Sequence, residues 1–173
     1  QSCEEIKNGS EKSDVMNAAE QMNQREEPSI SEPPQWLQDY VSTYNELNAG
    51  NLHLLNNIYS KNALFIDPLS KVEGLDALTE YFEHLYVNLT SCHFDLTGFI
   101  CNGSDAAIYW TMTVSHKKLK GGKPITLEGH SRLSQEEGKV TFQRDYFDAG
   151  AMIYEHVPVV GGLVRFVKAK ASA

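Results

Sequence analysis

The sequence has few cysteines and no long apolar run, and each of these absences excludes a class of protein. Its three cysteines, Cys3, Cys92 and Cys101, do not have the spacing of metal ligands, and an odd number is a poor basis for a disulfide framework. We therefore expect a reducing compartment and a cytoplasmic protein. No segment approaches the roughly 18 consecutive apolar residues that a transmembrane helix needs.

Clusters of positive charge and catalytic or cofactor-binding motifs are also absent. A formal net charge of −8, with no basic cluster, argues against a nucleic-acid-binding protein. The six histidines have no spacing typical of metal ligands. The sequence contains neither a glycine-rich phosphate loop nor a Gly-x-Ser-x-Gly nucleophile motif. We therefore expect no metal ion, no other cofactor and no nucleic-acid partner.

Changes in composition along the chain predict one folded domain between two tails. Residues 1–31 are rich in Glu, Gln, Asn and Ser, and they cannot bury enough apolar surface to offset the entropy of ordering them. We place the domain at residues 32–156, and the 41% hydrophobic content of the chain suits a globular core. Residues 157–173 form an apolar and basic helical tail. This tail could pack on its own domain, cover a cavity, contact a second protomer or lie on an anionic membrane surface.

Hydrophobic periodicity predicts helices first and a sheet afterwards. Apolar residues at helical spacing run from Trp36 to Leu47, and we expect Gly50 to close this helix and Asn51 to cap a second one. A strand at 63–66 and a third helix, to about residue 88, follow. From residue 92 to 147 the apolar residues alternate with polar ones, which predicts long antiparallel strands. The order is typical of an α+β fold, in which a sheet that curls around helices leaves a cavity between the layers.

The first candidate for chemistry is Asp67, where the apolar strand at 63–66 leaves the core. Pro68 has no N–H and must stop strand pairing at this point. A carboxylate between an apolar strand and an apolar helix is costly to desolvate unless something uses it. The alternative is that Asp67 caps a turn, as aspartate often does. The residues alone leave both interpretations open.

The second candidate is Asp145, in the last strand of the predicted sheet. Alternation puts Gln143, Asp145 and Phe147 on one face of this strand and the neighbouring residues on the other. If the Asp145 face is inward, burial without a cationic partner raises the pKa of its carboxyl toward neutrality. The alternative is a structural carboxylate that hydrogen bonds hold in place.

Other residues complete the predicted pocket. Tyr44, on the first helix, is a third group that could donate or accept a proton. Besides Gln143 and Phe147, four residues are expected to line the pocket: Tyr59, Phe82, Trp110 and Met112. For Trp110 and Met112, a plain core position is the alternative.

Several of these residues occur in a familiar order. Tyr44, the turn Asn48–Ala49–Gly50–Asn51, Tyr59 and Ile66–Asp67–Pro68 resemble the first part of ketosteroid isomerase in order and almost in spacing. The chain thus resembles the nuclear transport factor 2-like superfamily, which includes ketosteroid isomerase, limonene epoxide hydrolase and polyketide cyclases of the SnoaL type. The resemblance covers residues 35–156. It implies a cone-shaped, cystatin-like roll with three N-terminal helices on a curved antiparallel sheet, followed here by an extra C-terminal helix.

The resemblance also implies roles for single residues. By this match Asp67 falls on the general base of ketosteroid isomerase, and Tyr44 falls on the tyrosine of its oxyanion hole. The second oxyanion donor of that enzyme falls on Gly129. The segment Arg144–Asp148 resembles a strand of limonene epoxide hydrolase, and Asp145 falls on one of its catalytic aspartates. The partners of that aspartate fall on the uncharged residues 110–113.

Three functions are compatible with these residues. The first is a cofactor-free isomerase, cyclase or hydratase for a small apolar substrate, in which Asp67 takes a proton, Tyr44 binds the developing oxyanion and Asp145 is a second acid or base. The second is a binding module for a hydrophobic or lipid ligand. The third is a dimerising scaffold with a vestigial pocket. In each case we expect a homodimer.

Overall fold

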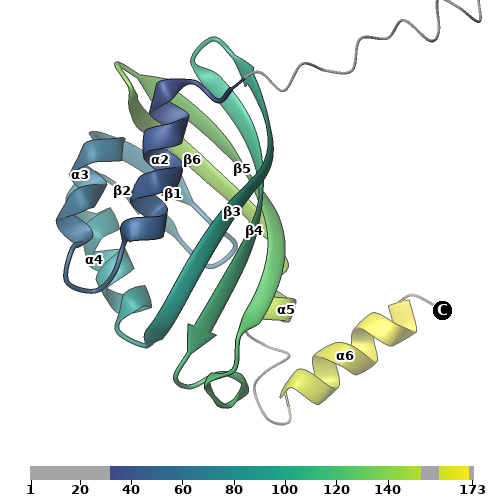
Figure 1. Cartoon of the computed structure of the whole chain (residues 1–173). Coiled ribbons are helices and arrows are strands. Elements are labelled where there is room, and N and C mark those ends of the chain that lie inside the picture. Colours follow the sequence, from purple (N-terminus) through teal and green to yellow (C-terminus); the bar gives the residue numbers. More distant parts are fainter. Residues whose placement is uncertain (1–31, 153–159, 172–173) are drawn as a thin grey trace, which may run out of the picture. The chain divides into compact units, whose positions relative to one another are not determined.

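The computed structural model describes residues 32–152 and 160–171, and a compact unit begins at Pro33 (Figure 1). The predicted tail at 1–31 lies outside the described residues. Among the described helices, none combines the length and the hydropathy that crossing a membrane requires. The described elements are α2 (Gln35–Glu46), the 3₁₀ helix η1 (Leu52–Leu54), α3 (Leu55–Ile58), β1 (Tyr59–Ile66), β2 (Lys71–Glu73), α4 (Leu75–Tyr86), β3 (Leu89–Asn102), β4 (Asp105–His116), η2 (Lys120–Gly122), β5 (Ile125–Glu136), β6 (Lys139–Phe147), α5 (Ala149–Met152) and α6 (Val160–Ala171).

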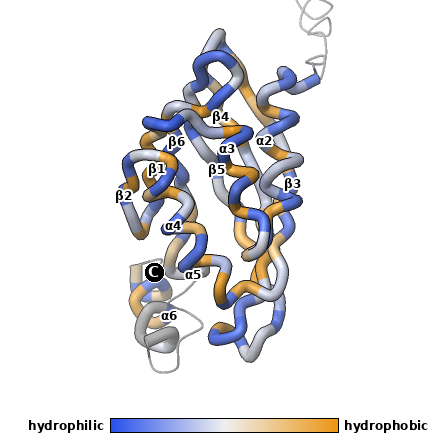
Figure 2. Tube along the Cα trace, turned by 90° about the vertical axis from the view of Figure 1, so that its left-hand side faces the viewer, coloured by the Kyte–Doolittle hydropathy of each residue, from blue (hydrophilic) through white to orange (hydrophobic). Residues whose placement is uncertain are grey.

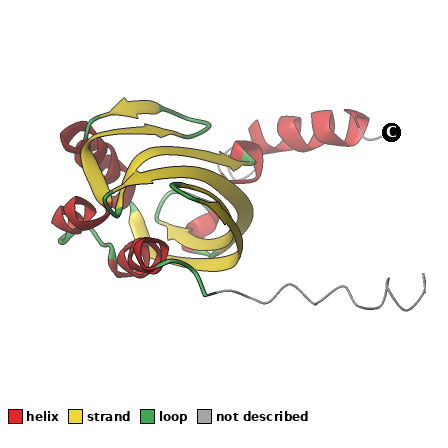
Figure 3. Ribbon diagram, turned by 90° about the horizontal axis from the view of Figure 1, so that it is seen from above, coloured by secondary structure: helices red, strands yellow, loops and turns green. Residues whose placement is uncertain are grey.

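Six strands form one curved, unclosed sheet in the order β2-β1-β6-β5-β4-β3 (Figure 3). Strands β3 to β6 are an antiparallel meander, which confirms the α+β fold that the change of period predicts. Strand β1 pairs in parallel with β6, so that Phe65 lies opposite Gln143. This pairing places the strand that leads into Asp67 directly beside the strand that carries Asp145.

Helices α2, α3 and α4 lie on one side of the sheet (Figures 1 and 3). Hydropathy alternates along these helices and along the long strands (Figure 2), because each element has one face toward the core and one toward water. Full burial of a large apolar side chain contributes about 1.5–3 kcal/mol. The largest fully buried apolar and aromatic side chains are Leu37, Tyr40, Leu55, Tyr59, Leu78, Ile108, Leu133 and Val140.

The turn after α2 differs from its prediction. Helix α2 ends at Glu46, before Gly50, and the Asn51 side chain makes no cap for the next helix. Instead, the Asn51 amide accepts a hydrogen bond from the Asn48 N–H (2.6 Å) and donates one to the Glu46 carbonyl (2.8 Å). These bonds satisfy backbone groups at the end of the helix without a left-handed glycine. Asn51 thus closes the helix before it rather than opening the one after it.

An indole ring and a glycine face each other across the sheet. Trp110 in β4 lies directly opposite Gly129 in β5. A Cβ atom on Gly129 would lie 2.4 Å from the Trp110 ring and 2.8 Å from the backbone oxygen of Tyr146. The indole N–H donates to the Ser131 Oγ at 2.9 Å. The absence of a side chain at Gly129 therefore gives the ring its place, and the hydrogen bond fixes its orientation.

We expect Gly129→Ala to destabilise the protein, because the added methyl group meets a packed ring and a backbone atom that cannot both move. Overpacking of this kind costs about 1–3 kcal/mol. Urea denaturation measures the loss. Gly98→Ala in β3 is the control, since its Cβ would lie 3.8 Å from the Tyr109 ring, an ordinary contact. Equal losses in the two variants would show that the glycine does not make room for the indole.

Candidate functional site

A cavity of about 300 Å³ lies between the sheet and helices α2 and α4. Aromatic and aliphatic side chains form most of its wall, and two carboxylates, two histidines and a cysteine complete it. A small concave site with a few polar groups in an apolar wall is typical of small-molecule binding. The lining residues are Tyr44, Phe65, Asp67, Leu69, Tyr81, Phe82, His84, Leu85, Tyr86, Leu89, Cys92, Met112, Val114, His116, Leu119, Asp145 and Phe147.

Asp145 is half-buried in this wall, and the described residues that donate hydrogen bonds to its carboxylate are both neutral. The Ser131 hydroxyl donates to Oδ1 at 2.6 Å, and the Gln143 side-chain amide donates to Oδ1 and Oδ2 at 2.9 and 3.1 Å. Burial raises the pKa of Asp145 to about 6, and the two donors offset only part of that effect. The carboxyl can therefore take up and release a proton near neutral pH.

Three tyrosines extend the hydrogen-bond network beyond Gln143: Tyr40 and Tyr59 contact it directly, and Tyr44 contacts Tyr59. The Gln143 carbonyl oxygen accepts hydrogen bonds from the hydroxyls of Tyr40, at 3.1 Å, and Tyr59. The hydroxyl oxygens of Tyr59 and Tyr44 are 2.5 Å apart. Because the single proton of Tyr59 goes to Gln143, the Tyr44 hydroxyl is the donor in this last pair. Tyr44 therefore ends a chain of hydrogen bonds at the cavity wall.

In this setting the Tyr44 hydroxyl is a hydrogen-bond donor rather than a base. Burial, and then the negative charge of Asp145, hold the pKa of the Tyr44 hydroxyl well above its usual value. The group keeps its proton at any physiological pH and can give a hydrogen bond to an oxygen in the cavity. The Ser131 hydroxyl is also oriented by a neighbour. It accepts a hydrogen bond from the Trp110 N–H and donates its own proton to Asp145.

Asp67 combines the two interpretations that the sequence left open. Its Oδ1 accepts hydrogen bonds from the backbone N–H groups of Leu69 and Ser70, both at 2.7 Å, as a turn-capping aspartate does. Its Oδ2 accepts a hydrogen bond from the Tyr81 hydroxyl at 2.6 Å. Asp67 also lines the cavity, so both predicted carboxylates face the same space.

The predicted lining residues fall in two layers. Phe82, Met112 and Phe147 line the cavity. Tyr59, Trp110 and Gln143, which we expected to line it as well, are not among the lining residues and instead form the buried layer behind its wall. Ser131, which no motif singles out, is 1% exposed and contacts Asp145 directly. The signal for it in the sequence is a serine at an inward position of an alternating strand.

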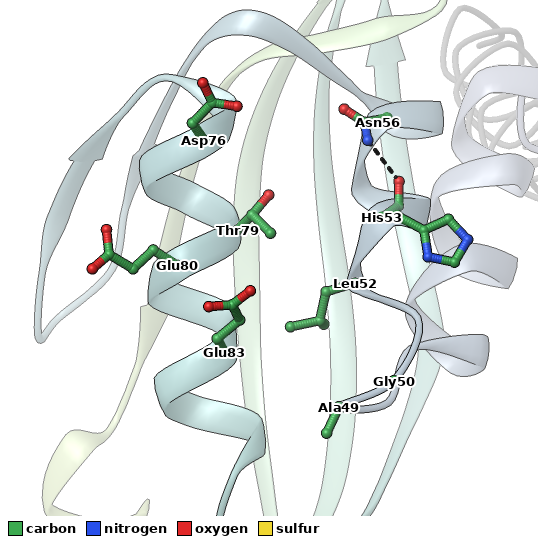
Figure 4. Close-up of a pocket in the computed structure, with 9 residues that line it drawn as sticks. All are labelled: Ala49, Gly50, Leu52, His53, Asn56, Asp76, Thr79, Glu80 and Glu83. Atoms are coloured by element: carbon green, nitrogen blue, oxygen red, sulfur yellow. Dashed lines mark hydrogen bonds between the residues drawn. The ribbon is translucent and has the colours of Figure 1, made fainter.

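A second depression, between α4 and residues 49–56, is open and polar (Figure 4). Its acidic side chains, Asp76, Glu80 and Glu83, are exposed, and water can hydrate their charges. Among the described residues, no group of histidine, cysteine, aspartate or glutamate side chains could hold a metal ion. The cavity that contains Asp145 is therefore the candidate site.

Comparison with solved structures supports the fold. A protein with a ketosteroid isomerase-like fold from Catenulispora acidiphila, in complex with trimethylamine, is 12% identical over 71% of this chain and 92% of its own, with a TM-score of 0.61. A nuclear transport factor 2-like protein of unknown function from Burkholderia pseudomallei is 17% identical over 70% and 96%, with a TM-score of 0.60. A candidate SnoaL-like polyketide cyclase from Jannaschia sp. CCS1 is 14% identical over 69% and 89%, with a TM-score of 0.59.

The curved sheet, its helices and the enclosed cavity define a member of the nuclear transport factor 2-like superfamily, as the resemblance implied. A model of the SnoaL-like domain matches residues 40–143, which is more than half of the chain. The chain belongs to the SnoaL-like domain family. A search of curated proteins finds no match to it.

The raised pKa of Asp145 predicts a stability effect whose sign depends on pH. The folded state keeps the proton of Asp145 up to about pH 6, whereas the unfolded state loses it near 3.8. Above pH 4 the wild type therefore loses stability that Asp145→Asn does not lose. We expect the free energy of unfolding of Asp145→Asn, relative to wild type, to rise by about 2 kcal/mol from pH 4.5 to 7.5.

Denaturation with urea at several pH values measures this difference. The control is Asp39→Asn, which removes an exposed carboxylate in α2 whose hydrogen-bond partner, Gln35, carries no charge. Its stability relative to wild type should change much less over the same range. A difference between Asp145→Asn and wild type that stays constant with pH would contradict burial of the charged form.

Proposed function

We propose that this SnoaL-like protein binds a small apolar molecule in the cavity and moves a proton beside a carbonyl group without a cofactor. The observation that supports this most is the Asp145 carboxyl, whose pKa of about 6 and position on an apolar wall suit a general base at neutral pH. The volume of about 300 Å³ is at the low end for ligand sites, and it equals about ten water molecules at roughly 30 Å³ each. A molecule of one or two rings would fill it.

In this proposal, Asp145 takes the proton from a carbon next to the carbonyl. The negative charge then moves to the carbonyl oxygen, and Tyr44 turns its hydroxyl proton from Tyr59 to this oxygen. Tyr44 exchanges one hydrogen bond for another, and Tyr59 keeps its bond to Gln143. Positioned bases contribute about 10²–10⁴-fold to a rate, and oriented donors to an oxyanion about 10²–10³-fold.

Asp67 has a different position in this scheme from the one that the resemblance implied. Three donors already hold its carboxylate, and two of them are backbone groups of its own turn. We propose that Asp67 fixes the turn and, through Tyr81, the shape of the cavity, whereas Asp145 is the base. Cyclisation of a polyketide also begins with removal of a proton beside a carbonyl, so the same roles would serve an isomerase or a cyclase.

Deuterium exchange tests the base without knowledge of the natural substrate. We expect the wild-type protein to accelerate exchange of the protons next to the carbonyl of 2-tetralone in D₂O, followed by proton NMR. Asp145→Asn should lose about 10²-fold or more of the acceleration and Tyr44→Phe about tenfold or more, because they remove the base and the oxyanion donor. The wild-type rate should rise with pH and level off above about 6.

Asp39→Asn, at an exposed position of α2, is the matched control and should exchange like wild type. If Asp145→Asn catalysed exchange as well as wild type while Asp67→Asn did not, the roles of the two carboxylates would be reversed. If the wild type bound 2-tetralone without exchange, the alternative of a binding module would be favoured.

We also propose that the chain forms a homodimer through the outer face of its sheet. Three rows of side chains cross this face at successive positions of the strand register. Asp95 and Glu128 lie in an acidic row, and Arg132 and Arg144 in a basic row. The row between them contains Tyr109, His130 and Tyr146, of which the two tyrosines are 46% and 41% exposed and the His130 and Tyr146 rings stack.

Consider two sheets stacked face to face, with a two-fold axis between them that runs along the aromatic row. This symmetry would place the acidic row of each protomer on the basic row of its partner. Such a surface is self-complementary, as an isologous dimer requires. We expect Arg144→Glu and Glu128→Arg each to weaken the dimer at least tenfold, because each new side chain would face side chains of like charge on the partner protomer. The double variant should recover most of the affinity, because it exchanges the two signs. Sedimentation velocity measures the dissociation constants.

Glu80→Lys, at an exposed position of α4 on the helix side of the sheet, reverses a charge away from these rows and should leave the dimer unchanged. A wild-type protein that is monomeric at high micromolar concentration would contradict the dimer. A double variant no better than the single ones would contradict the arrangement of the rows.

A further inference from the structure

In the part of the chain that the structure describes, the cavity wall contains acidic side chains but no lysine or arginine. Among the described residues that line it, the ionisable ones besides tyrosine and cysteine are Asp67, Asp145, His84 and His116. Burial, and then Lys118, hold the pKa of His116 below its usual value, so this histidine is neutral at pH 7.5. The Lys118 side chain itself is exposed to water and is not part of the wall. The balance of charge inside the cavity is therefore negative above the pKa of Asp145.

Aromatic rings make up a large part of the same wall. The rings come from Tyr44, Phe65, Tyr81, Phe82, Tyr86 and Phe147. Neighbouring rings are steeply inclined, by 73° for Tyr44 and Phe82 and by 81° for Tyr81 and Phe82. The faces of aromatic rings are negative and attract cations.

The Asp145 carboxylate has unused capacity to accept hydrogen bonds. An ionised carboxylate offers about four acceptor positions, and Ser131 and Gln143 provide three bonds, of which only the longest, 3.1 Å, reaches Oδ2. Neither donor carries a positive charge. A carboxylate in an apolar wall interacts strongly with any cation that enters, since the local dielectric screens the pair weakly. Both carboxylates repel an anionic ligand.

We propose that the ligand of this cavity is a small organic cation, an amine or quaternary ammonium group on an apolar body. The positive group lies against Asp145 and the aromatic rings, and the apolar body contacts the aliphatic part of the wall. The inference rests on the proposed function, whose apolar substrate it narrows to molecules with a basic or quaternary nitrogen. Carboxylates and phosphates are excluded as ligands.

Three probes of nearly equal shape separate charge from size. Choline carries one positive charge, 3,3-dimethylbutan-1-ol replaces its nitrogen with carbon and is neutral, and 3,3-dimethylbutanoate is a branched anion of similar size. Isothermal titration calorimetry with the full chain at pH 7.5 gives the three affinities. We expect choline to bind at least tenfold more tightly than the alcohol, and the carboxylate to bind more weakly than either. In Asp145→Asn the ratio of the choline affinity to the alcohol affinity should fall to below threefold.

The pH dependence provides a second readout. Ionisation of Asp145 favours the cation, so the affinity for choline should rise from pH 5 to 7.5 and that for the alcohol should not. Besides Ser131 and Gln143, the groups near Asp145 on the packed elements are Asp67 after β1 and four tyrosines: Tyr40 and Tyr44 in α2, Tyr59 in β1 and Tyr81 in α4. His84 in α4 and His116 in β4 also line the cavity. Protonation of either histidine would also oppose choline, and Asp145→Asn separates the two sources because it retains both histidines.

The control variant Asp39→Asn, which changes an exposed carboxylate in α2 outside the cavity and the dimer rows, should keep the wild-type ratio of affinities. If the alcohol or the carboxylate binds wild type as tightly as choline, the inference is overturned, although the exchange of 2-tetralone can still succeed and uphold the proposed function. If none of the three probes binds, the inference is also overturned. Loss of both probe binding and exchange in a folded protein would overturn the proposed function as well.

Discussion

The withdrawal of one carboxylate from water is the constraint on which the rest of the site depends. Asp145 faces an apolar space, and its charge is compensated by two neutral donors rather than by a cation. Each donor is itself fixed by another group. Trp110 orients Ser131, and Tyr40 and Tyr59 occupy the carbonyl oxygen of Gln143, so that its N–H group points to Asp145. The carboxylate is therefore ordered without being neutralised, and this condition keeps its proton affinity high.

The packing of the sheet reaches the site through this network. Gly129 lets the Trp110 ring lie flat across β5, and the ring brings its N–H to Ser131. A glycine that has no direct contact with the cavity thus decides the direction of a hydrogen bond to the carboxylate. By the resemblance, Gly129 falls on the second oxyanion donor of ketosteroid isomerase. In this structure it instead leaves space for the Trp110 ring behind the cavity wall.

The general plan of the fold was predictable because periodicity reports which face of each element is buried. The change from helical to alternating spacing predicts the α+β order, and the alternation near Asp145 correctly puts Gln143, Asp145 and Phe147 on one face. Periodicity does not report which strands pair, so the parallel contact of β1 with β6 and the short strand β2 could not be found. The end of α2 was misplaced because asparagine side chains, rather than a left-handed glycine, close it.

The candidate site was predictable in part, for a related reason. Asp67 and Asp145 could be singled out as carboxylates next to apolar segments, and the structure places both on one cavity. Ser131 and Tyr40 acquire their roles only from the strand register and from the packing of α2, which no local pattern encodes. Tyr59, Trp110 and Gln143 point to the inner side of the sheet, as predicted, but lie one layer behind the cavity wall. Side-chain length and the neighbouring Gly129 decide whether such a side chain reaches the cavity.

The parallel pairing of β1 with β6 has a consequence for how the protein is made. These strands are neighbours in space but lie about 80 residues apart in the chain (Tyr59 opposite Val140, Ile66 opposite Arg144). On the ribosome, helices α2 to α4, strand β1 and most of the meander emerge before β6, the strand that completes the wall. Contacts between distant segments form slowly because a long loop must first close. The nascent chain therefore exposes its apolar interior until β6 has emerged, and Asp145 arrives together with the strand that completes the wall.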